Sequence, residues 1–319
     1  MRSLLILVLS LLAFGQDRAK TLALEMQRLT AEGNILAARQ LVPTAEQQIE
    51  KLGLANPNSA MLVNQIAILQ QMLGQYAEAE QTYARAIQKL EKQDPSGLSL
   101  TILLLNLART YLETNDQPGH AEVLARRALE LAKAHFGADS PQLGMFLITL
   151  GSARQQQGHR QEAQRLYEQA FGGGPGNSEL DKYQMALVFQ NLGLLEALDH
   201  KWQVAKQHLS DAIALQSEAN GPNHPNLIRP YLSLAEMHIM RKEWTAASEC
   251  VAKARAIAEA QLSPSHPIMA EILARAAEIA RKSGHRTEAR RLERQAQAFL
   301  PDSRPSRSRV HVSDLVQSR

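Results

Sequence analysis

The sequence predicts an all-α, right-handed superhelical solenoid of tandem two-helix repeats, and three observations lead to this fold class. Two series of alanines recur with a spacing of about 42 residues. Aromatic residues make up only 4% of the chain, whereas Ala and Leu are abundant. The alternating Val/Ile/Thr runs that are typical of strands do not occur in the sequence. A register this constant is expected where helix pairs stack and meet at the same small residue. The first series is Ala38, Ala79, Ala121, Ala163, Ala205, Ala247 and Ala289, and the second is Ala45, Ala86, Ala128, Ala170, Ala212, Ala254 and Ala296.

Residues 1–15 have the pattern of a secretory signal peptide. Arg2 precedes an apolar stretch over residues 4–14, and the segment ends in a small-x-small cleavage pattern. The stretch is shorter than the roughly 20 residues that a membrane span needs. We therefore expect an exported protein, periplasmic or secreted, whose mature chain begins at Gln16. An uncleaved membrane anchor is the alternative.

The unit at residues 62–91 shows the elements that each full repeat is expected to contain. Its first helix carries a large apolar residue followed by a small one, Ile66-Ala67, and Gly74 ends that helix. A small residue at this place lets the axis of the first helix approach that of the second. The same position in the six full repeats holds Ala67, Ala108, Gly151, Gly193, Ala235 and Ala277.

The two ends of the predicted solenoid depart from this pattern. The first unit, residues 19–52, has Met26 where the others have a small residue, and Pro43 lies inside its second helix. The last unit has Glu293 at a position that is apolar elsewhere. Terminal repeats lack one neighbour, so we expect atypical caps on a solenoid of about seven repeats over residues 16–300. The glycine-rich residues 172–176 are a candidate flexible bend.

These blocks resemble tetratricopeptide repeats, and their period and linkers resemble the longer kinesin-light-chain type. The resemblance rests on Asn106-Leu107-Ala108 and Asn191-Leu192-Gly193 in first helices, and on Gly221-Pro222-Asn223-His224-Pro225 in a linker. It covers roughly residues 17–299. The matching motifs describe a fold rather than a reaction.

The resemblance implies a concave groove lined by the first helices, with one polar residue per repeat projecting into it. In the kinesin-light-chain family, groove asparagines hold the main chain of extended peptides. An amide side chain suits this role because it carries a donor and an acceptor together. The alternative is that these polar residues only solvate an exposed face. The predicted peptide-binding residues are Gln65, Asn106, Arg109, Thr149, Asn191, Ser233 and Arg275.

No motif in the sequence indicates catalysis, a cofactor or a metal site. HExxH, GxSxG and phosphate-binding glycine loops are missing, and Cys250 is the only cysteine. We expect Cys250 to be a small, partly buried packing residue. Four histidines recur at turns and linkers, and we interpret them as turn and capping residues rather than metal ligands. They are His159, His224, His266 and His285.

The charge distribution narrows the class of partner. The formal net charge is +3, and without residues 1–15 and the tail the chain is close to neutral. A nucleic-acid binder should show a basic stripe with stacking aromatics, so we expect no nucleic-acid partner and only indirect membrane association. Charges in the C-terminal repeats alternate in sign, which predicts a ligand that is neither uniformly acidic nor uniformly basic. A protein or peptide is the expected ligand.

The tail, residues 301–319, is rich in Ser, Arg and Pro and is expected to be disordered. Within it, residues 309–316 alternate apolar and polar side chains, so this segment is able to lie extended in a groove. It is a placeholder in the chain's own groove, a docking peptide or a plain linker end.

The sequence thus predicts an exported protein–protein interaction scaffold that binds an extended peptide or a partner helix in its concave groove. The alternative is a structural assembly factor of a cell-envelope complex that acts through its convex face and its ends.

Overall fold

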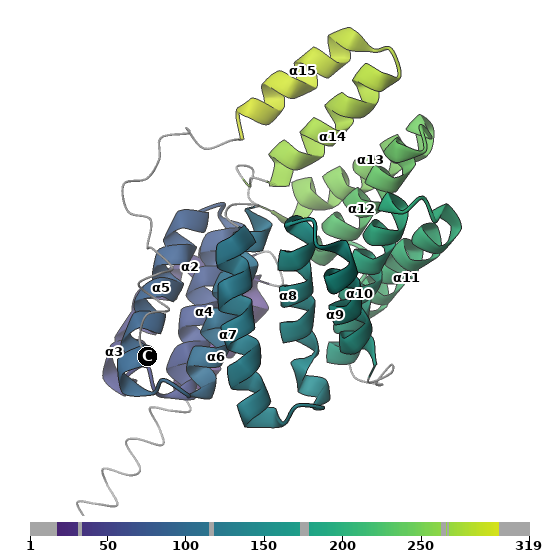
Figure 1. Cartoon of the computed structure of the whole chain (residues 1–319). Helices are drawn as coiled ribbons and strands as arrows, with labels where there is room; N and C mark the ends of the chain where they lie inside the picture. Colours follow the sequence, from purple (N-terminus) through teal and green to yellow (C-terminus); the bar gives the residue numbers. More distant parts are fainter. Residues whose placement is uncertain are drawn as a thin grey trace, which may run out of the picture. The chain divides into compact units, whose positions relative to one another are not determined.

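The computed structural model describes residues 18–30, 34–114, 118–172, 179–262, 266 and 268–299. Within these residues the chain is α-helical without a strand, which confirms the predicted class (Figure 1). The described residues divide into two compact units, unit 1 up to Ser140 and unit 2 from Pro141 onward. Residues 1–15, most of the glycine-rich bend and the tail lie outside the described residues, so the predictions made for them stay predictions.

Unit 1 contains three helix pairs, and the first helix of the first pair covers residues 18–30. The second helix of the first pair is split in two, and the next two pairs are regular. The helices are α2 (Ile35–Gln40), α3 (Val42–Leu52), α4 (Pro57–Met72), α5 (Tyr76–Gln93), α6 (Leu98–Glu113) and α7 (Pro118–Phe136).

Unit 2 contains four helix pairs, and two of their first helices are preceded by a 3-10 turn. The elements are η1 (Pro141–Leu143), α8 (Gly144–Gln156), α9 (Arg160–Phe171), α10 (Glu179–Leu198), α11 (Trp202–Asn220), η2 (Pro225–Leu227), α12 (Ile228–Met240), α13 (Trp244–Gln261), α14 (Ile268–Lys282) and α15 (Arg286–Gln297). Trp202 and Trp244 are the first residues of second helices, as expected for packing residues. The described chain therefore forms seven successive helix pairs.

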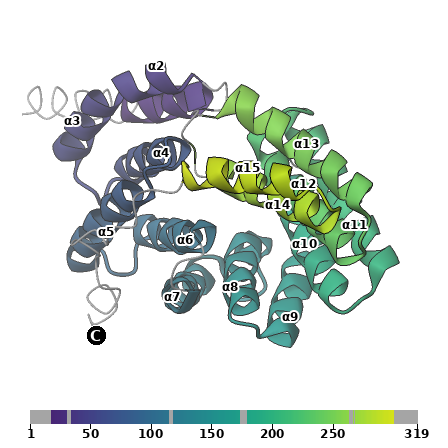
Figure 2. The same cartoon turned by 90° about the horizontal axis from the view of Figure 1, so that it is seen from above.

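The alanine series lie where the second helices pack. Every member of the two series is buried except Ala170, which is half-buried. Within unit 1, α4 packs on α5, α5 on α6 and α6 on α7, so that α4 and α6 form one row and α5 and α7 another (Figure 2). This arrangement of stacked pairs confirms the α-solenoid read from the 42-residue spacing.

Two glycines of unit 2 mark the closest approach of first to second helix. A Cβ added to Gly193 lies 2.7 Å from Leu209 Cγ and 3.1 Å from the carbonyl oxygen of Ala205. A Cβ added to Gly151 lies 2.6 Å from the ring of Tyr167. No side chain fits at either position without displacing the second helix.

The turn between the two helices of a repeat requires a left-handed residue. Gly74, Gly158 and Gly284 have φ values of 77°, 85° and 92° at this turn. In two repeats the same turn is made by His200 and Lys242, both with φ 61°. An L side chain in this region is disfavoured, so these two repeats carry backbone strain that glycine avoids.

The linker histidines are caps, and the turn histidines are not. His224 Nδ1 accepts a hydrogen bond from Asn226 N at 3.1 Å, and His266 Nδ1 accepts one from Ile268 N at 3.1 Å. His159 and His285 occupy the residue before α9 and α15, but their side chains make no capping hydrogen bond. The capping interpretation is therefore correct for the two linker histidines only.

The atypical first repeat has a local cause. Met26 is fully buried, and Pro43 lies in the first turn of α3, where it separates α3 from α2. Proline is tolerated in a first turn because its missing N–H has no helical partner there. Cys250 is buried, and burial raises the pKa of its thiol, which agrees with a packing residue. In the part of the chain that the structure describes, no helix is long and apolar enough to cross a membrane.

Candidate binding surface on the first helices

The first helices of unit 1 expose a narrow strip between their buried faces, which we call the first-helix face. Its α4 residues are half-buried, whereas the residues between them, among them Leu62 and Ile66, are buried. The strip follows the helical repeat along both helices. It consists of Met61, Asn64, Ile68, Gln71 and Met72 from α4 and of Leu98, Ile102, Asn106 and Arg109 from α6.

A hydrogen-bonded amide pair lies at the centre of this face. Asn106 Nδ2 donates to Asn64 Oδ1 at 2.7 Å, and the Tyr83 hydroxyl donates to the same oxygen at 2.9 Å. Tyr83 is fully buried on α5, and burial raises the pKa of its phenol, so the hydroxyl stays protonated. Asn64 is thus held in place by a residue on the second helix of its own repeat, and Asn64 in turn positions Asn106.

A second polar contact crosses from α4 to α6 one turn further on. Gln71 Nε2 donates to Thr110 Oγ1 at 2.8 Å, and that hydroxyl donates to the carbonyl oxygen of Asn106 at 2.9 Å. Both contacts link successive first helices. They fix the relative register of α4 and α6 as well as the side chains of the face.

Unit 2 repeats this arrangement in a weaker form. Tyr167 is fully buried, and its hydroxyl lies 2.8 Å from Gln155 Oε1 and 3.3 Å from Ser152 Oγ. Asn191 Nδ2 donates to the same serine oxygen at 3.4 Å. A buried tyrosine therefore contacts a first-helix amide in both units, but in unit 2 it reaches Asn191 only through Ser152, over contacts of 3.3 Å and 3.4 Å.

Ion pairs replace the amides between α12 and α14. Arg275 lies 3.1 Å from Glu236 and 3.4 Å from Glu278, and Arg229 lies 3.2 Å from Glu271. All five side chains belong to first helices of unit 2. The predicted residue Arg275 is therefore engaged by two carboxylates of its own chain.

The structure divides the predicted peptide-binding residues into two groups. Asn106, Arg109, Asn191 and Arg275 are partly exposed, as a binding role requires. The exposed fractions of Gln65, Thr149 and Ser233 are 7%, 3% and 6%. The prediction that these three side chains project from the first helices into a groove is therefore wrong. Ligand contact by the other four residues stays a prediction.

The three buried residues are engaged or enclosed within the fold. Thr149 Oγ1 donates to the carbonyl oxygen of Met145 at 2.7 Å, and Ser233 Oγ accepts from Gln190 Nε2 at 3.3 Å. Gln65 Oε1 is enclosed without a hydrogen-bond partner among the described residues. Burial follows because each of these residues lies on the side of its helix that packs against a neighbouring helix.

Asn64 is the central residue that the sequence argument missed. Alignment through the apolar–small pairs matches Asn106 with Gln65, because Ala67 and Ala108 are 41 residues apart. The alanine period of about 42 residues instead matches Asn106 with Asn64, and these two side chains meet. The alanine period of the second helices therefore predicts better which first-helix residues correspond to one another on the first-helix face.

Family models support the repeat assignment. A model described as tetratricopeptide repeat matches residues 184–251 and 227–302, and another with the same description matches residues 103–142. No curated protein matches the sequence.

Solved structures of low sequence identity share the fold. Cut9 in the Cut9–Hcn1 hetero-tetramer of the APC/C has a TM-score of 0.60 at 14% identity, and the match covers 93% of this chain and 48% of that one. The quorum sensor NprR from B. thuringiensis in its apo form has a TM-score of 0.56 at 14% identity, with 89% and 88% covered. NprR in complex with its cognate peptide NprX gives 0.57 at 15% identity, with 88% and 86% covered.

Proposed function

Because the chain is a tetratricopeptide-repeat protein, we propose that it is a protein–protein interaction scaffold that holds an extended peptide or a partner helix on its first-helix face. The observation that carries this proposal is the amide pair of Asn64 and Asn106. Asn64 Oδ1 already accepts two hydrogen bonds, and neither Asn64 Nδ2 nor Asn106 Oδ1 has a partner among the described residues. The pair offers a donor and an acceptor, which is what a peptide main chain needs.

This conclusion does not depend on how the two amides are oriented. If both amides are flipped, Asn64 Nδ2 donates to Tyr83 and Asn106, and the two groups left over are again one acceptor and one donor. The fold is compatible with such a ligand, since NprR, which shares it, occurs in complex with a peptide. We propose no catalytic role, because no reactive constellation accompanies the amides.

The test uses Asn64→Ala together with Asn106→Ala, and circular dichroism establishes that the variant is folded. A partner is first captured from the envelope fraction with the wild-type chain and identified by mass spectrometry, and its Kd is then measured for each variant. We expect binding to weaken about tenfold or more, since two main-chain contacts are lost at about 0.5–1.5 kcal/mol each. Asn220→Ala, which removes an amide at the end of α11, is the matched control. Unchanged binding by the double variant contradicts the proposal.

We also propose that the chain is exported, on the basis of Arg2 and the apolar residues 4–14. The mature protein should then begin at or near Gln16 and be found outside the cytoplasm. N-terminal sequencing of protein from fractionated cells tests this directly. Recovery of the intact N-terminus in the cytoplasm contradicts export without affecting the binding proposal.

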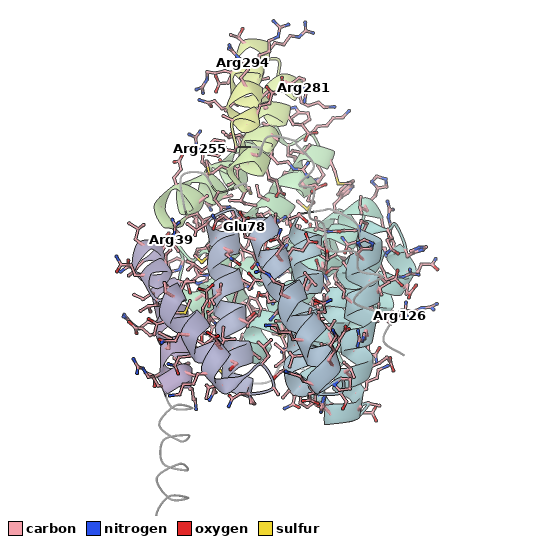
Figure 3. The ribbon with its side chains drawn as sticks, turned by 90° about the vertical axis from the view of Figure 1, so that its left-hand side faces the viewer. Arg39, Glu78, Arg126, Arg255, Arg281 and Arg294 are labelled. Carbon is pink, nitrogen blue, oxygen red and sulfur yellow. The ribbon has the colours of Figure 1, made fainter. Side chains whose placement is uncertain are left out.

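One feature supports the alternative, an assembly factor that acts through its ends. α15 is the last helix among the described residues, and Arg286, Arg290 and Arg294 form an exposed row along it. Arg294 points away from the helices in Figure 3. Replacing all three arginines with glutamine separates the two functions. Loss of the captured partner in this variant, but not in the double asparagine variant, favours the assembly factor.

A further inference from the structure

Charge is distributed unevenly over the first helices, and this narrows the chemistry of the ligand. α4 contains no charged residue, and the only charged residues of α6 are Arg109 and Glu113 in its last two turns. The remainder of the first-helix face of unit 1 is made of amides and apolar side chains. Ile102 and Leu98 are 40% and 43% exposed, although both are large and apolar.

We propose that this face binds an uncharged peptide segment in extended conformation, with apolar side chains at alternate positions. The proposal deepens the proposed function and rests on it. The amide pair holds the main chain of the segment, and the side chains on one side of it cover Ile102 and Leu98 of α6. Alternate positions are specified because successive side chains of an extended chain point to opposite sides.

Desolvation disfavours a charged ligand residue over α4 and over the part of α6 before Arg109. A ligand charge brought against α4 loses its water and finds no opposite charge on that helix. An apolar side chain in the same place removes exposed apolar area of Ile102 and Leu98 from water, which is favourable in proportion to the area. The methionines of α4, Met61 and Met72, have flexible side chains that adapt to different apolar partners.

The charged first helices of unit 2 do not serve the same ligand. The carboxylates of Glu236, Glu271 and Glu278 are each within 3.4 Å of Arg229 or Arg275. These side chains are 30–44% exposed, so a ligand that displaced one member of such a pair would lose only the modest attraction of a surface ion pair. The charged groups of α12 and α14 are nevertheless paired with one another, whereas Asn64 Nδ2 on α4 and Asn106 Oδ1 on α6 have no partner among the described residues.

Selection from a displayed library of random ten-residue peptides tests the proposal. Wild-type protein is used as the target, and the Kd values of the enriched peptides are then measured with purified variants. Ile102→Glu places a charge on the face, and Val123→Glu places the same charge on the second helix α7 at an equal exposure of 40%. Arg229→Gln with Glu271→Gln removes an ion pair of unit 2 and keeps an uncharged polar side chain at both positions. Circular dichroism establishes that each variant is folded.

We expect the enriched peptides to contain fewer Asp, Glu, Lys and Arg residues than the input library and to be apolar at alternate positions. Ile102→Glu should weaken their binding about tenfold or more, because an uncharged ligand buries the new carboxylate without compensation. Val123→Glu and the double glutamine variant should leave the Kd unchanged within about twofold.

The outcomes separate this inference from the function on which it rests. Enriched peptides that are as charged as the input, or binding that is lost with the double glutamine variant rather than with Ile102→Glu, overturn the inference and leave peptide binding standing. A selection that enriches no peptide overturns peptide binding itself, and the inference with it.

Discussion

The first helices of the two units are built on the same repeat but present different surfaces. In unit 1, α4 and α6 meet through neutral hydrogen bonds, Asn106 to Asn64 and Gln71 to Thr110. In unit 2, α12 and α14 meet through ion pairs that involve Arg229 and Arg275. The neutral contacts leave donors and acceptors open, whereas the ion pairs satisfy one another. A single repeat architecture can therefore carry one surface with unpaired donors and acceptors and another whose charges are paired with one another.

The units also differ in how their first helices begin. Asn56 caps α4 in unit 1 by accepting a hydrogen bond from Asn58 N at 2.9 Å. His224 and His266 do the same for the corresponding starts in unit 2. The Asn56 side chain carries no proton that titrates near neutral pH, whereas the His224 cap is lost when its ring is protonated. The cap of α4 is thus insensitive to pH, and the cap before α12 is sensitive.

The largest expected effect concerns the close helix approach in unit 2. Gly193→Leu should destabilise the protein by about 1–3 kcal/mol, because the new side chain overlaps Leu209 and meets the backbone oxygen of Ala205. Amide hydrogen exchange, resolved by unit, is the measurement, and the loss of protection should be concentrated in α10 to α13. Gly119→Ala is the control, since a Cβ there has no atom within 4 Å. An unchanged melting curve for Gly193→Leu would show that the packing register is wrong.

The second-largest expected effect is the pH dependence of the stability that the His224 cap provides. His224 Nδ1 accepts a hydrogen bond, so this cap needs the neutral ring, and burial lowers the pKa of His224 in the folded state. The stabilisation is complete above the unfolded pKa of about 6.5 and is lost as the pH falls through the lower folded value. We expect about 1 kcal/mol of cap energy to disappear under acid conditions.

Its control comes from unit 1. His224→Asn copies the cap that Asn56 provides, so it should keep the stability and reduce the dependence on pH. Urea unfolding at pH 5 and pH 7.5 measures both chains. If wild type and His224→Asn lose the same stability in acid, the histidine cap is not the cause.

A smaller effect concerns the strained turns of unit 2. Lys242→Gly should stabilise the protein by about 0.5–1 kcal/mol, because φ at this position is 61° and glycine adopts that conformation without strain. Lys206→Gly, one turn after the start of α11, should instead destabilise it by about 1 kcal/mol. Thermal melting of the two variants against wild type measures the difference. A destabilising Lys242→Gly would mean that its side chain matters more than its backbone.

The smallest effect is expected from the tail. Removal of residues 301–319 should change neither melting nor partner affinity if the segment is a linker end. A gain in affinity would identify residues 309–316 as a placeholder, and the loss of one interaction would identify them as a docking peptide. Isothermal titration with the captured partner distinguishes the three outcomes.

Much of the fold was predictable from the sequence because packing requirements recur with the repeat. The alanine series and Gly193 follow from the closest approach of two helices, which a single small residue satisfies. The histidine caps were predictable from their place before a proline in the linkers. The exposed residues of the first helices were harder to predict. Gln65 and Asn64 are adjacent in the sequence, and only the structure shows that Gln65 is buried against a neighbouring helix and Asn64 is half-buried.

The uneven distribution of charge along the chain was missed, because a net charge does not show where the basic and acidic residues lie. Residues 281–297 contain six basic and two acidic residues, a net charge of +4, whereas residues 1–280 contain 25 basic and 28 acidic residues, a net charge of −3. A neutral total therefore concealed a basic α15 and the basic turn that precedes it. The expectation of no nucleic-acid partner assumed that the chain has no basic stripe, and residues 281–297 correct that assumption, although no aromatic residue accompanies the stripe there.

The placement of Trp202 and Trp244 has a practical consequence for spectroscopy. They are the only two tryptophans of the chain, and both begin second helices of unit 2. Intrinsic fluorescence excited at the indole band therefore reports on unit 2 alone, whereas far-ultraviolet ellipticity sums over the helices of both units. Coincident transitions would mean that the solenoid melts as one cooperative block, and separated transitions would give the stability of each half from the unmodified protein.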